Sequence, residues 1–451
     1  MRQRAERGRR PARRQSGYKR ESIPRQAQLF DVITLGNGGD GLARPVVPSE
    51  DNTDPVFIPF TAPGDRVLAR QTSRDRAIPK QIIVAAPERI DPICALFGRC
   101  GGCALQHLPM AWSLEWKTTL LQTGFRKAGV SDLPDIHQIQ SQPGSRRRAD
   151  LALRRLPGAI TIGLHQRGGD PVDLTGCHLL HPTLISLLPP LRDLLLKTDL
   201  LKREGDLLIN LLDSGPDLLL STDTAPTTSD RSCLAAFATQ YAIPRIAWRR
   251  AGTLDDPEIL TQIAPVRIHF GDAEVEPPPG AFLQASHDGE AAIQAAVIAA
   301  LPHISGRKAR VIELYAGCGT LTFPLADHVH VEAFEGHPAA VRALQQASSG
   351  RRIDVSLRDL NRQPVESRDL ASALAVILDP PRSGAGLQMT QILDGKPDVL
   401  IYVSCNPKVL FRDTATLLAK GYRLDSVTLV DQFLWSAEIE TVCRFSRSRG
   451  R

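Results

Sequence analysis

The sequence has no apolar run long enough to cross a membrane, which needs about 18–20 consecutive residues. One long apolar stretch, Leu184 to Leu196, is interrupted by Pro189, Pro190 and Arg192. The N-terminus also lacks the apolar core of a secretory signal, and no internal repeat is visible. We therefore expect a soluble cytoplasmic protein without a membrane partner.

Acidic residues are scarce in the first 20 positions, which hold eight Arg and one Lys against the single Glu6. Such a segment cannot bury apolar area, so we expect residues 1–20 to form a disordered basic arm. An arm of this kind can hold nucleic-acid phosphates. A solvated tail of an arginine-rich chain and a mitochondrial transit peptide are the alternatives.

Disulfides are not expected, although the chain has eight cysteines, because thiols stay reduced in the cytosol. The spacing C-x5-C-x2-C, followed by a cysteine in Gly-Cys-His, singles out four of them. They are Cys94, Cys100, Cys103 and Cys177. Four thiolates from two segments can hold either zinc or an iron–sulfur cluster, and the spacing does not decide between them.

The chain is long enough for two or three domains, with 451 residues, 42% of them hydrophobic and 23% charged. Residues 21–88 predict a small β-barrel, because short strand-like runs alternate with a glycine-rich turn at residues 36–41. The expected strands cover residues 27–33, 56–60, 65–70 and 81–85. A five-stranded, OB-like barrel commonly binds single-stranded nucleic acid, and a purely structural barrel is the alternative.

Two α/β regions are expected after the barrel. A helix is predicted over residues 112–126, and mixed strands and helices fill a central domain that ends near the proline-rich stretch 276–280. Beyond it, buried strands alternate with helices, which is typical of a Rossmann-like, doubly wound sheet. The predicted strands of that sheet cover residues 309–314, 330–334, 374–378 and 399–403.

A glycine turn follows the first of these strands. Gly317 and Gly319 allow a tight turn and a close approach of the backbone to a ligand. Glu335 lies 18 residues after Gly317, where a carboxylate can accept hydrogen bonds from ribose hydroxyls. A third glycine and a pyrophosphate loop are missing, so the site predicts S-adenosylmethionine rather than NAD. Cys318 inside the turn is expected to be a small filler.

A thiol and a carboxylate stand near the C-terminus. Cys405 directly follows the apolar run 399–403, where a doubly wound sheet opens its ligand crevice. Glu440 comes 35 residues later, and its neighbours Ile439, Thr441 and Val442 favour a strand. A thiol nucleophile paired with a carboxylate base can activate an unreactive ring carbon.

These features together resemble the RNA (uracil-5-)-methyltransferase family, in particular its iron–sulfur branch, which carries a TRAM-type barrel and modifies 23S ribosomal RNA. The resemblance covers nearly the whole chain beyond the arm. Its markers are the barrel, the cysteine set, the glycine turn and four short motifs. The motifs are Phe282-Leu283-Gln284, Asp379-Pro380-Pro381-Arg382, Ser404-Cys405-Asn406-Pro407 and the terminal Glu440.

The resemblance implies a role for each site residue. Cys405 attacks carbon 6 of uracil and Glu440 takes the proton from carbon 5, while Asp379 orients the base and Phe282 covers it after it leaves its stack. S-adenosylmethionine is held by a second group of residues. They are Gln284, Tyr315, Gly317, Gly319, Thr320, Glu335 and Asp379.

The resemblance also implies a domain plan and a second cofactor. Residues 107–137 and 280–451 form the methyltransferase domain, and residues 89–106 and 138–279 form the central domain. The four cysteines hold a 4Fe-4S cluster, whose role is to staple the loop around Gly98–Gly102 to the central domain for RNA contact. The expected partner is RNA, with 23S rRNA preferred, and the expected state is a monomer.

Two positions depart from the family pattern. Glu438 stands where the family often has histidine, and Thr320 where some relatives have asparagine. Residues i and i+2 of a strand face the same side, so Glu438 is expected either to raise the proton affinity of Glu440 or to face solvent.

Three other functions compete with this interpretation. A tRNA methyltransferase is expected to lack the barrel and the cysteine set. The second alternative is an RNA-binding protein with a degenerate catalytic domain, because Glu438 replaces the histidine that the family often has. A cluster-based redox sensor is the third alternative.

Overall fold

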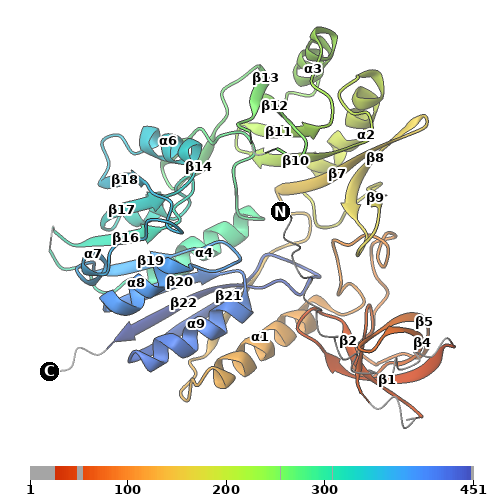
Figure 1. Cartoon of the computed structure of the whole chain (residues 1–451), viewed down its shortest axis with the longest axis horizontal. Helices are drawn as coiled ribbons and strands as arrows, with labels where there is room; N and C mark the ends of the chain where they lie inside the picture. Colours follow the sequence, from red (N-terminus) through yellow and green to blue (C-terminus); the bar gives the residue numbers. More distant parts are fainter. Residues whose placement is uncertain (1–25, 48–53, 254, 307, 448–451) are drawn as a thin grey trace, which may run out of the picture. The chain divides into compact units, whose positions relative to one another are not determined.

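The computed structural model describes residues 26–47, 54–253, 255–306 and 308–447, and Figure 1 shows the order of its elements. The chain forms two compact units. The N-terminal barrel makes up the first, and Asn37–Gly39 with the chain from Glu88 onward makes up the second. The basic arm expected at residues 1–20 lies outside the described residues.

The first unit is a closed five-stranded barrel with the strand order β1-β2-β3-β5-β4. Its strands are β1 (Gln28–Leu35), β2 (Gly41–Pro45), β3 (Val56–Ile58), β4 (Arg66–Ser73) and β5 (Arg76–Val84). Alternate side chains such as Phe30 and Val32 point into its core. The predicted barrel is confirmed, and β2 is a strand that the sequence analysis did not identify.

The second unit contains a seven-stranded central sheet in the order β13-β12-β11-β10-β7-β8-β9. The strands are β7 (Arg148–Leu156), β8 (Ala159–His165), β9 (Pro171–Asp173), β10 (Glu204–Leu212), β11 (Gly215–Thr222), β12 (Arg245–Arg250) and β13 (Glu258–Gln262). Leucines of α2 (Pro182–Lys197) and side chains of α3 (Thr228–Gln240) share one core with this sheet. A hairpin of β14 (Ile268–Phe270) and β15 (Ala273–Val275) follows.

An eight-stranded sheet completes the unit, in the order β18-β17-β16-β19-β20-β22-β21-β6. The strands are β6 (Ile136–Gln140), β16 (Arg310–Leu314), β17 (His330–Glu335), β18 (Ile353–Leu357), β19 (Ala375–Leu378), β20 (Val399–Ser404), β21 (Tyr422–Asp431) and β22 (Glu440–Arg447). The first five in this order are parallel, and β22 runs antiparallel to β20. The predicted doubly wound sheet is confirmed. β6 belongs to it, although we expected the central domain to begin at residue 138.

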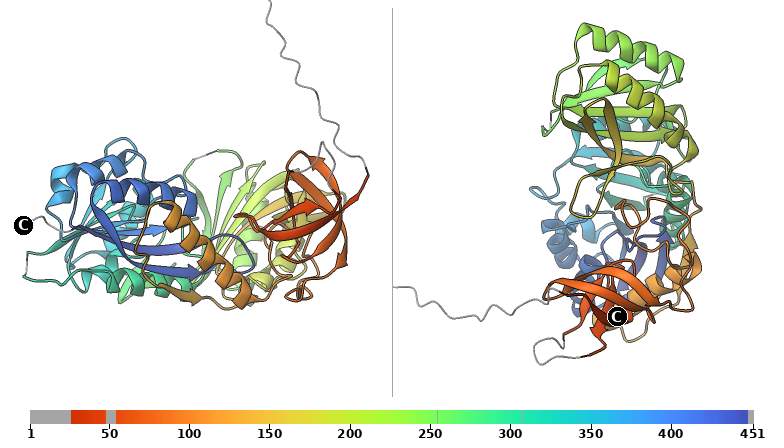
Figure 2. Two further views of the ribbon diagram at one scale, coloured as in Figure 1. Left: turned by 90° about the horizontal axis from the view of Figure 1, so that it is seen from below. Right: turned by 90° about the vertical axis from the view of Figure 1, so that its right-hand side faces the viewer.

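Helices cover both faces of this sheet, as Figures 1 and 2 show. One hydrophobic cluster includes α4 (His287–Ala299), α5 (Thr322–Ala326) and α6 (Pro338–Ala347). The other includes α1 (Met110–Lys127), α7 (Ser367–Ala371), α8 (Leu387–Gly395) and α9 (Pro407–Ala419). Among the helices of the described ranges, none is both long and apolar enough to span a membrane.

The strand order reverses between β16 and β19, which are neighbours in the sheet but lead to opposite sides of it. In a doubly wound sheet, ligands bind at the carboxyl ends of the strands beside such a switch point. The glycine turn follows β16 and Asp379 follows β19, so both lie at that position.

Candidate active site

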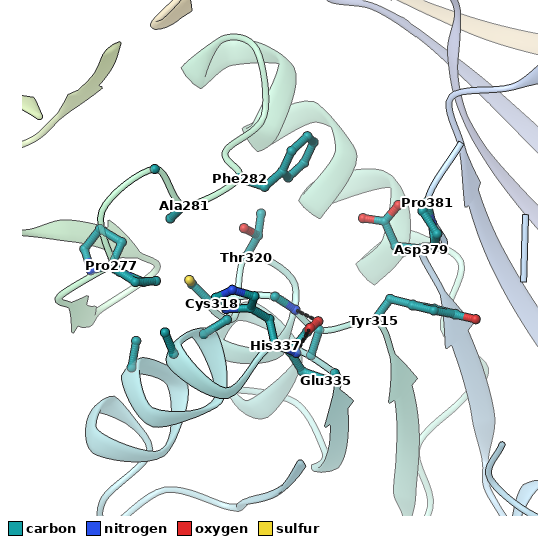
Figure 3. Close-up of a pocket in the computed structure, with 18 of the residues that line it drawn as sticks. Pro277, Ala281, Phe282, Tyr315, Cys318, Thr320, Glu335, His337, Asp379 and Pro381 are labelled. Carbon is teal, nitrogen blue, oxygen red and sulfur yellow. Dashed lines mark hydrogen bonds between the residues drawn. The ribbon is translucent and has the colours of Figure 1, made fainter. Parts of the chain in front are cut away.

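A cleft of about 1180 Å³ opens at this switch point (Figure 3). Almost every residue that the sequence analysis assigned to cofactor or base lines it. These residues are Phe282, Gln284, Tyr315, Gly317, Thr320, Glu335, Asp379, Cys405 and Glu440. The sequence therefore located one site from segments that lie far apart along the chain.

The glycine turn is fixed by the carboxylate of Glu335. The Gly317 N–H donates to Glu335 Oε2 over 2.9 Å, and the His337 N–H donates to Oε1 over 2.7 Å (Figure 3). Gly317 has φ +57°, and no atom lies within 4 Å of where a Cβ would stand. The turn thus leaves open space at Gly317, beside the Glu335 carboxylate, which two backbone N–H groups hold in place.

Gly319, which we expected to contact the cofactor, is not among the residues that line the cleft. A Cβ at Gly319 would lie 2.5 Å from the Phe323 ring and 2.7 Å from Leu344, and its φ is +101°. The residue is therefore needed for the close packing of the turn against α5 and α6.

Tyr315 begins the turn with a left-handed backbone, φ +66°, which is rare for a bulky residue. The Phe334 carbonyl holds it there by accepting the N–H groups of Tyr315 and Ala316 over 2.9 Å and 3.1 Å. Burial, with the charges of Asp359 and Glu335, raises the pKa of the Tyr315 phenol to about 12. The phenol stays neutral and donates to the Ala385 carbonyl over 3.2 Å.

Strand register brings Cys405 and Glu440 together. In the antiparallel pair of β20 and β22, Ser404 lies opposite Thr441. One further step along both strands places Cys405 opposite Glu440. The Thr441 hydroxyl donates to the Ser404 carbonyl over 3.1 Å, a further bond between the end of β20 and the start of β22.

Burial disfavours the charged form of both groups. Burial raises the pKa of the half-buried Cys405 thiol to about 11, with further increases from Glu440 and Asp379 and a decrease from Arg382. Glu440 is only 4% exposed, and burial, together with the charge of Asp379, raises its pKa well above the usual value. Burial also raises the pKa of Asp379 to about 7.

Two residues of the site escaped the sequence analysis. The Gln432 amide donates to Gln284 Oε1 over 2.8 Å and to Glu440 Oε2 over 3.4 Å, so it joins Glu440 to the Phe282-Leu283-Gln284 motif. Glu313 lines the cleft, and burial raises its pKa to about 8. The polar side chain of Thr322 lowers this pKa, and the charges of Asp379 and Glu335 raise it. Neither residue stands in a motif, so only the folded structure shows their positions.

Glu438 does not share a strand face with Glu440, because β22 begins only at Glu440. Its carboxylate forms a two-point ion pair with Arg382, at 2.6 Å and 3.0 Å. Asp379, not Glu438, is the carboxylate whose charge adds to burial in raising the pKa of Glu440. The expectation that Glu438 acts directly on the base is therefore wrong.

Phe282 lies at the exposed side of the cleft with 67% of its surface accessible. The guanidinium carbon of Arg148 is 4.8 Å from the centre of its ring. A large exposed aromatic ring backed by a cation offers a face on which a planar base can stack.

The four cysteines lie in two segments of the second unit. Cys94, Cys100 and Cys103 precede α1, and Cys177 precedes α2; all four are half-buried free thiols. Burial raises the pKa of Cys103 to about 12, and the other three thiols raise it further, so the four lie within electrostatic reach of one another. Within the described ranges, however, no three His, Cys, Asp or Glu side chains converge as a metal-ligand group.

The fold and site define a Rossmann-like methyltransferase, with a glycine turn after β16 and the candidate residues Asp379 and Cys405 after β19 and β20. A family model for tRNA (Uracil-5-)-methyltransferase matches residues 355–448, which include Cys405 and Glu440. An uncharacterized RNA methyltransferase of Brucella suis biovar 1 is 33% identical over 93% of this chain and 97% of that protein. The 23S rRNA (uracil(1939)-C(5))-methyltransferase of Chromohalobacter salexigens is 30% identical over 97% of this chain and 94% of that protein. The chain belongs to the RNA (uracil-5-)-methyltransferase family, whose members are S-adenosylmethionine-dependent enzymes.

The solved structure of Pyrococcus abyssi tRNA (uracil-54, C5)-methyltransferase in complex with S-adenosyl-L-homocysteine has a similar fold. It is 20% identical, with a TM-score of 0.69, and the match covers 92% of this chain and 100% of that one. A match over 92% of the chain must extend into the barrel. The barrel therefore does not separate rRNA from tRNA enzymes, contrary to our expectation.

Proposed function

We propose that this protein methylates carbon 5 of a uridine in structured RNA, with 23S rRNA as the substrate. One observation carries the proposal: the register of β20 and β22 brings the Cys405 thiol and the Glu440 carboxyl into the cleft that also holds the glycine turn. The relative that acts on 23S rRNA matches over nearly the full length of both chains and supports that choice of RNA.

The residues of the turn fit S-adenosylmethionine. Glu335 is oriented for the ribose hydroxyls by two backbone N–H groups, and the open space beside Gly317 leaves room for the ligand. Thr320, Tyr315, Gln284 and Asp379 complete the lining. When bound, S-adenosylmethionine supplies an electrophilic methyl group.

Cys405 makes carbon 5 nucleophilic. Its thiolate adds to carbon 6, the sulfur electron pair forms the S–C6 bond, and the π pair of the C5=C6 bond moves towards carbon 5 and the neighbouring carbonyl. The reactive form is the thiolate, so the raised pKa of the free thiol must fall when RNA occupies the cleft. Arg382, whose charge lowers that pKa, is the cation available for this.

Glu440, in its carboxylate form after it has given up its own proton, removes the proton from carbon 5 once that carbon carries the methyl group. The C–H electron pair then re-forms the C5=C6 bond, the S–C6 bond breaks, and Cys405 leaves as a thiolate. A carboxylate with a raised pKa is a stronger base than an ordinary glutamate, which suits the abstraction of a proton from carbon.

Phe282 and Asp379 contact the uracil ring. A uracil inside folded RNA must leave its stack before a thiol can reach carbon 6. The exposed Phe282 ring, backed by Arg148, can then cover the base, and the Asp379 carboxyl, with a pKa of about 7, can hydrogen-bond its edge in either protonation state.

The cysteine set is proposed to hold a 4Fe-4S cluster. Its thiols influence one another, and polar groups already point at two of them: the Gly102 N–H at Cys100 Sγ over 3.5 Å, and the Gln106 amide at Cys103 Sγ over 3.2 Å. Such hydrogen bonds to sulfur are typical of cluster sites. Iron, sulfide and zinc analysis of protein purified without oxygen tests this, and stoichiometric zinc without sulfide would contradict it.

The RNA target is tested by incubating the protein with 23S rRNA or tRNA transcripts and S-adenosylmethionine, followed by mass-spectrometric mapping. We expect 5-methyluridine at a uridine of 23S rRNA. Product in tRNA alone would favour the tRNA alternative. No 5-methyluridine in either RNA would refute the methyltransferase and leave the RNA-binding protein with a degenerate site.

A further inference from the structure

The loop that leads into Glu440 connects the active site with the cysteine set. This base loop, residues 432–439, runs from the end of β21 to the start of β22. At its first residue, Gln432 bonds to Gln284 and Glu440. In its middle, the Trp435 carbonyl accepts the N–H groups of Ala104 and Leu105, over 2.7 Å and 2.9 Å.

The side chain of Trp435 packs on the same region. It is only 6% exposed and forms a small apolar cluster with Leu179 and Leu434, against which Cys103 and Cys177 pack. Two cysteines from separate segments thus contact the cluster that holds the middle of the base loop. Residues 94–106, which we call the cysteine segment, are also tied to the central sheet through the Gly101 N–H and the His165 carbonyl, 3.0 Å apart.

The backbone of Trp435 is strained. Its φ is +54°, in the left-handed region that bulky residues rarely adopt. Such a conformation persists only when the surroundings enforce it. The two N–H groups of the cysteine segment supply that enforcement at the carbonyl of the strained residue itself.

The backbone of Cys405 is set by elements outside this loop, although the loop residue Glu438 forms an ion pair with Arg382, whose charge acts on the thiol. Cys405 follows the buried strand β20 and precedes α9, whose first turn is capped by the Asn406 side chain. The Asn406 amide also donates to the Arg382 carbonyl over 2.8 Å. Loosening the base loop should therefore disturb Glu440 while leaving the backbone of Cys405 in place.

We propose that the cysteine segment positions the base Glu440 through Trp435, so that Trp435 is a positioning residue for proton removal from carbon 5. This inference rests on the proposed function. It gives the cysteine set a task beyond RNA contact: it braces the loop on which the base depends. No electron transfer is involved.

The inference predicts which step fails when the brace is weakened. Addition of Cys405 to carbon 6 and methylation of carbon 5 continue, but proton removal and expulsion of the thiolate become slow. Enzyme then accumulates as a covalent adduct with methylated RNA, which survives denaturation. A general loss of structure would instead lower adduct formation and turnover together.

The test compares Trp435→Ala and Trp435→Phe on ordinary uridine RNA with S-adenosylmethionine. For Trp435→Ala we expect turnover to fall about 10- to 100-fold, as for a misplaced catalytic group, while the first methyl transfer keeps its rate. The covalent adduct on a denaturing gel should rise accordingly, and Trp435→Phe should restore release. Trp248→Ala, which removes a partly buried tryptophan of β12 from the central core, controls for the loss of a large side chain, and its folded fraction should release product as the wild type does.

A variant of the cysteine segment gives an independent answer. Gln106 is buried, bonds to Cys103 Sγ and to the Cys94 N–H, and does not line the cleft. Gln106→Ala should also accumulate adduct. The fluorescence of Trp435 is obtained by subtracting the spectrum of a protein that carries Trp435→Phe, in both the wild-type and the Gln106→Ala background. Its emission maximum should differ between the two backgrounds even without RNA.

Three outcomes would overturn the inference. The first is a parallel fall of turnover and adduct formation, and the second is normal release in both Trp435→Ala and Gln106→Ala. The third is a Trp435→Ala protein that loses its fold while Gln106→Ala releases product normally. If the wild type forms neither 5-methyluridine nor adduct, the proposed function fails instead, so the two failures are distinguishable.

Discussion

At the scale of single residues, the site contains two acids and a thiol whose charged forms are disfavoured by burial. The Cys405 thiol has a pKa of about 11, and the same burial that raises it also raises the pKa of Asp379 to about 7 and that of Glu440 well above normal. Charge on any one of the three disfavours charge on the others. The free enzyme is thus protected from stray alkylation and oxidation of its thiol.

The pH dependence of Cys405 alkylation by iodoacetamide measures this coupling in the free protein. The alkylation rate should still be rising at about pH 10, beyond the value of about 8.5 at which an ordinary cysteine titrates. Glu440→Gln removes a negative charge and should lower the apparent pKa, whereas Arg382→Ala removes a positive charge and should raise it. Equal profiles for all three proteins, measured on the Cys405 peptide by mass spectrometry, would contradict the account.

The positions of residues within motifs were predictable, but the partners of residues outside the motifs were not. Cys405, Glu440, Asp379 and Glu335 could be assigned because each stands at the end of a strand that faces the crevice. Gln432 could not, since its partner Gln284 is 148 positions away and only the folded chain brings them together.

At the scale of elements, the two glycines of the turn from β16 into α5 have different surroundings. Gly317 faces open space beside Glu335, whereas Gly319 is closed in by Phe323 and Leu344. The sequence analysis gave both glycines the same role, because a Gly-x-Gly pattern reports a tight turn without saying which glycine faces the ligand.

Alanine substitutions separate these roles. Gly319→Ala should lower the free energy of unfolding by about 2–4 kcal/mol through overlap and a left-handed backbone, and leave the affinity of the folded fraction for S-adenosylmethionine nearly unchanged. Gly317→Ala should cost about 1–2 kcal/mol of stability and weaken that affinity. Thermal unfolding and calorimetric titration measure both. A weaker affinity in Gly319→Ala than in Gly317→Ala would refute the division.

Other elements show where sequence patterns are insufficient. The parallel strands β16, β17, β19 and β20 were predicted because strands buried on both faces are continuous apolar runs. β18 was missed, because it is a mostly exposed edge strand. The short β2 begins at the last glycine of a run that reads as a turn, and only its closure of the barrel makes it a strand.

At the scale of the whole molecule, the protein combines one catalytic cleft with several features suited to RNA. These features are the barrel, the ring of Phe282 beside Arg148 and the basic N-terminal sequence, which lie far apart along the chain. Contacts to phosphates supply much of the affinity for RNA and make it salt-dependent. The arm has eight arginines and one lysine, so its contribution should be visible in that dependence.

Deleting residues 1–20 tests the arm. RNA binding should weaken, and the slope of log Kd against log salt concentration should flatten by about 0.7 for each phosphate that the shortened protein no longer neutralises. An arm of equal length with its arginines replaced by serine is the matched control for charge, and it should behave like the deletion. A slope identical to that of the full chain would show that the arm is a solvated tail.

The most direct measurement of the central claim is a covalent trap. RNA carrying 5-fluorouridine at the methylated position, with S-adenosylmethionine, should give a denaturation-resistant complex, because fluorine cannot leave carbon 5 as a proton does. Mass spectrometry should find the nucleotide on Cys405, Glu440→Gln should still form the complex, and Cys405→Ala should not. No complex with the wild type on an RNA that it methylates, or attachment to another residue, would contradict the account.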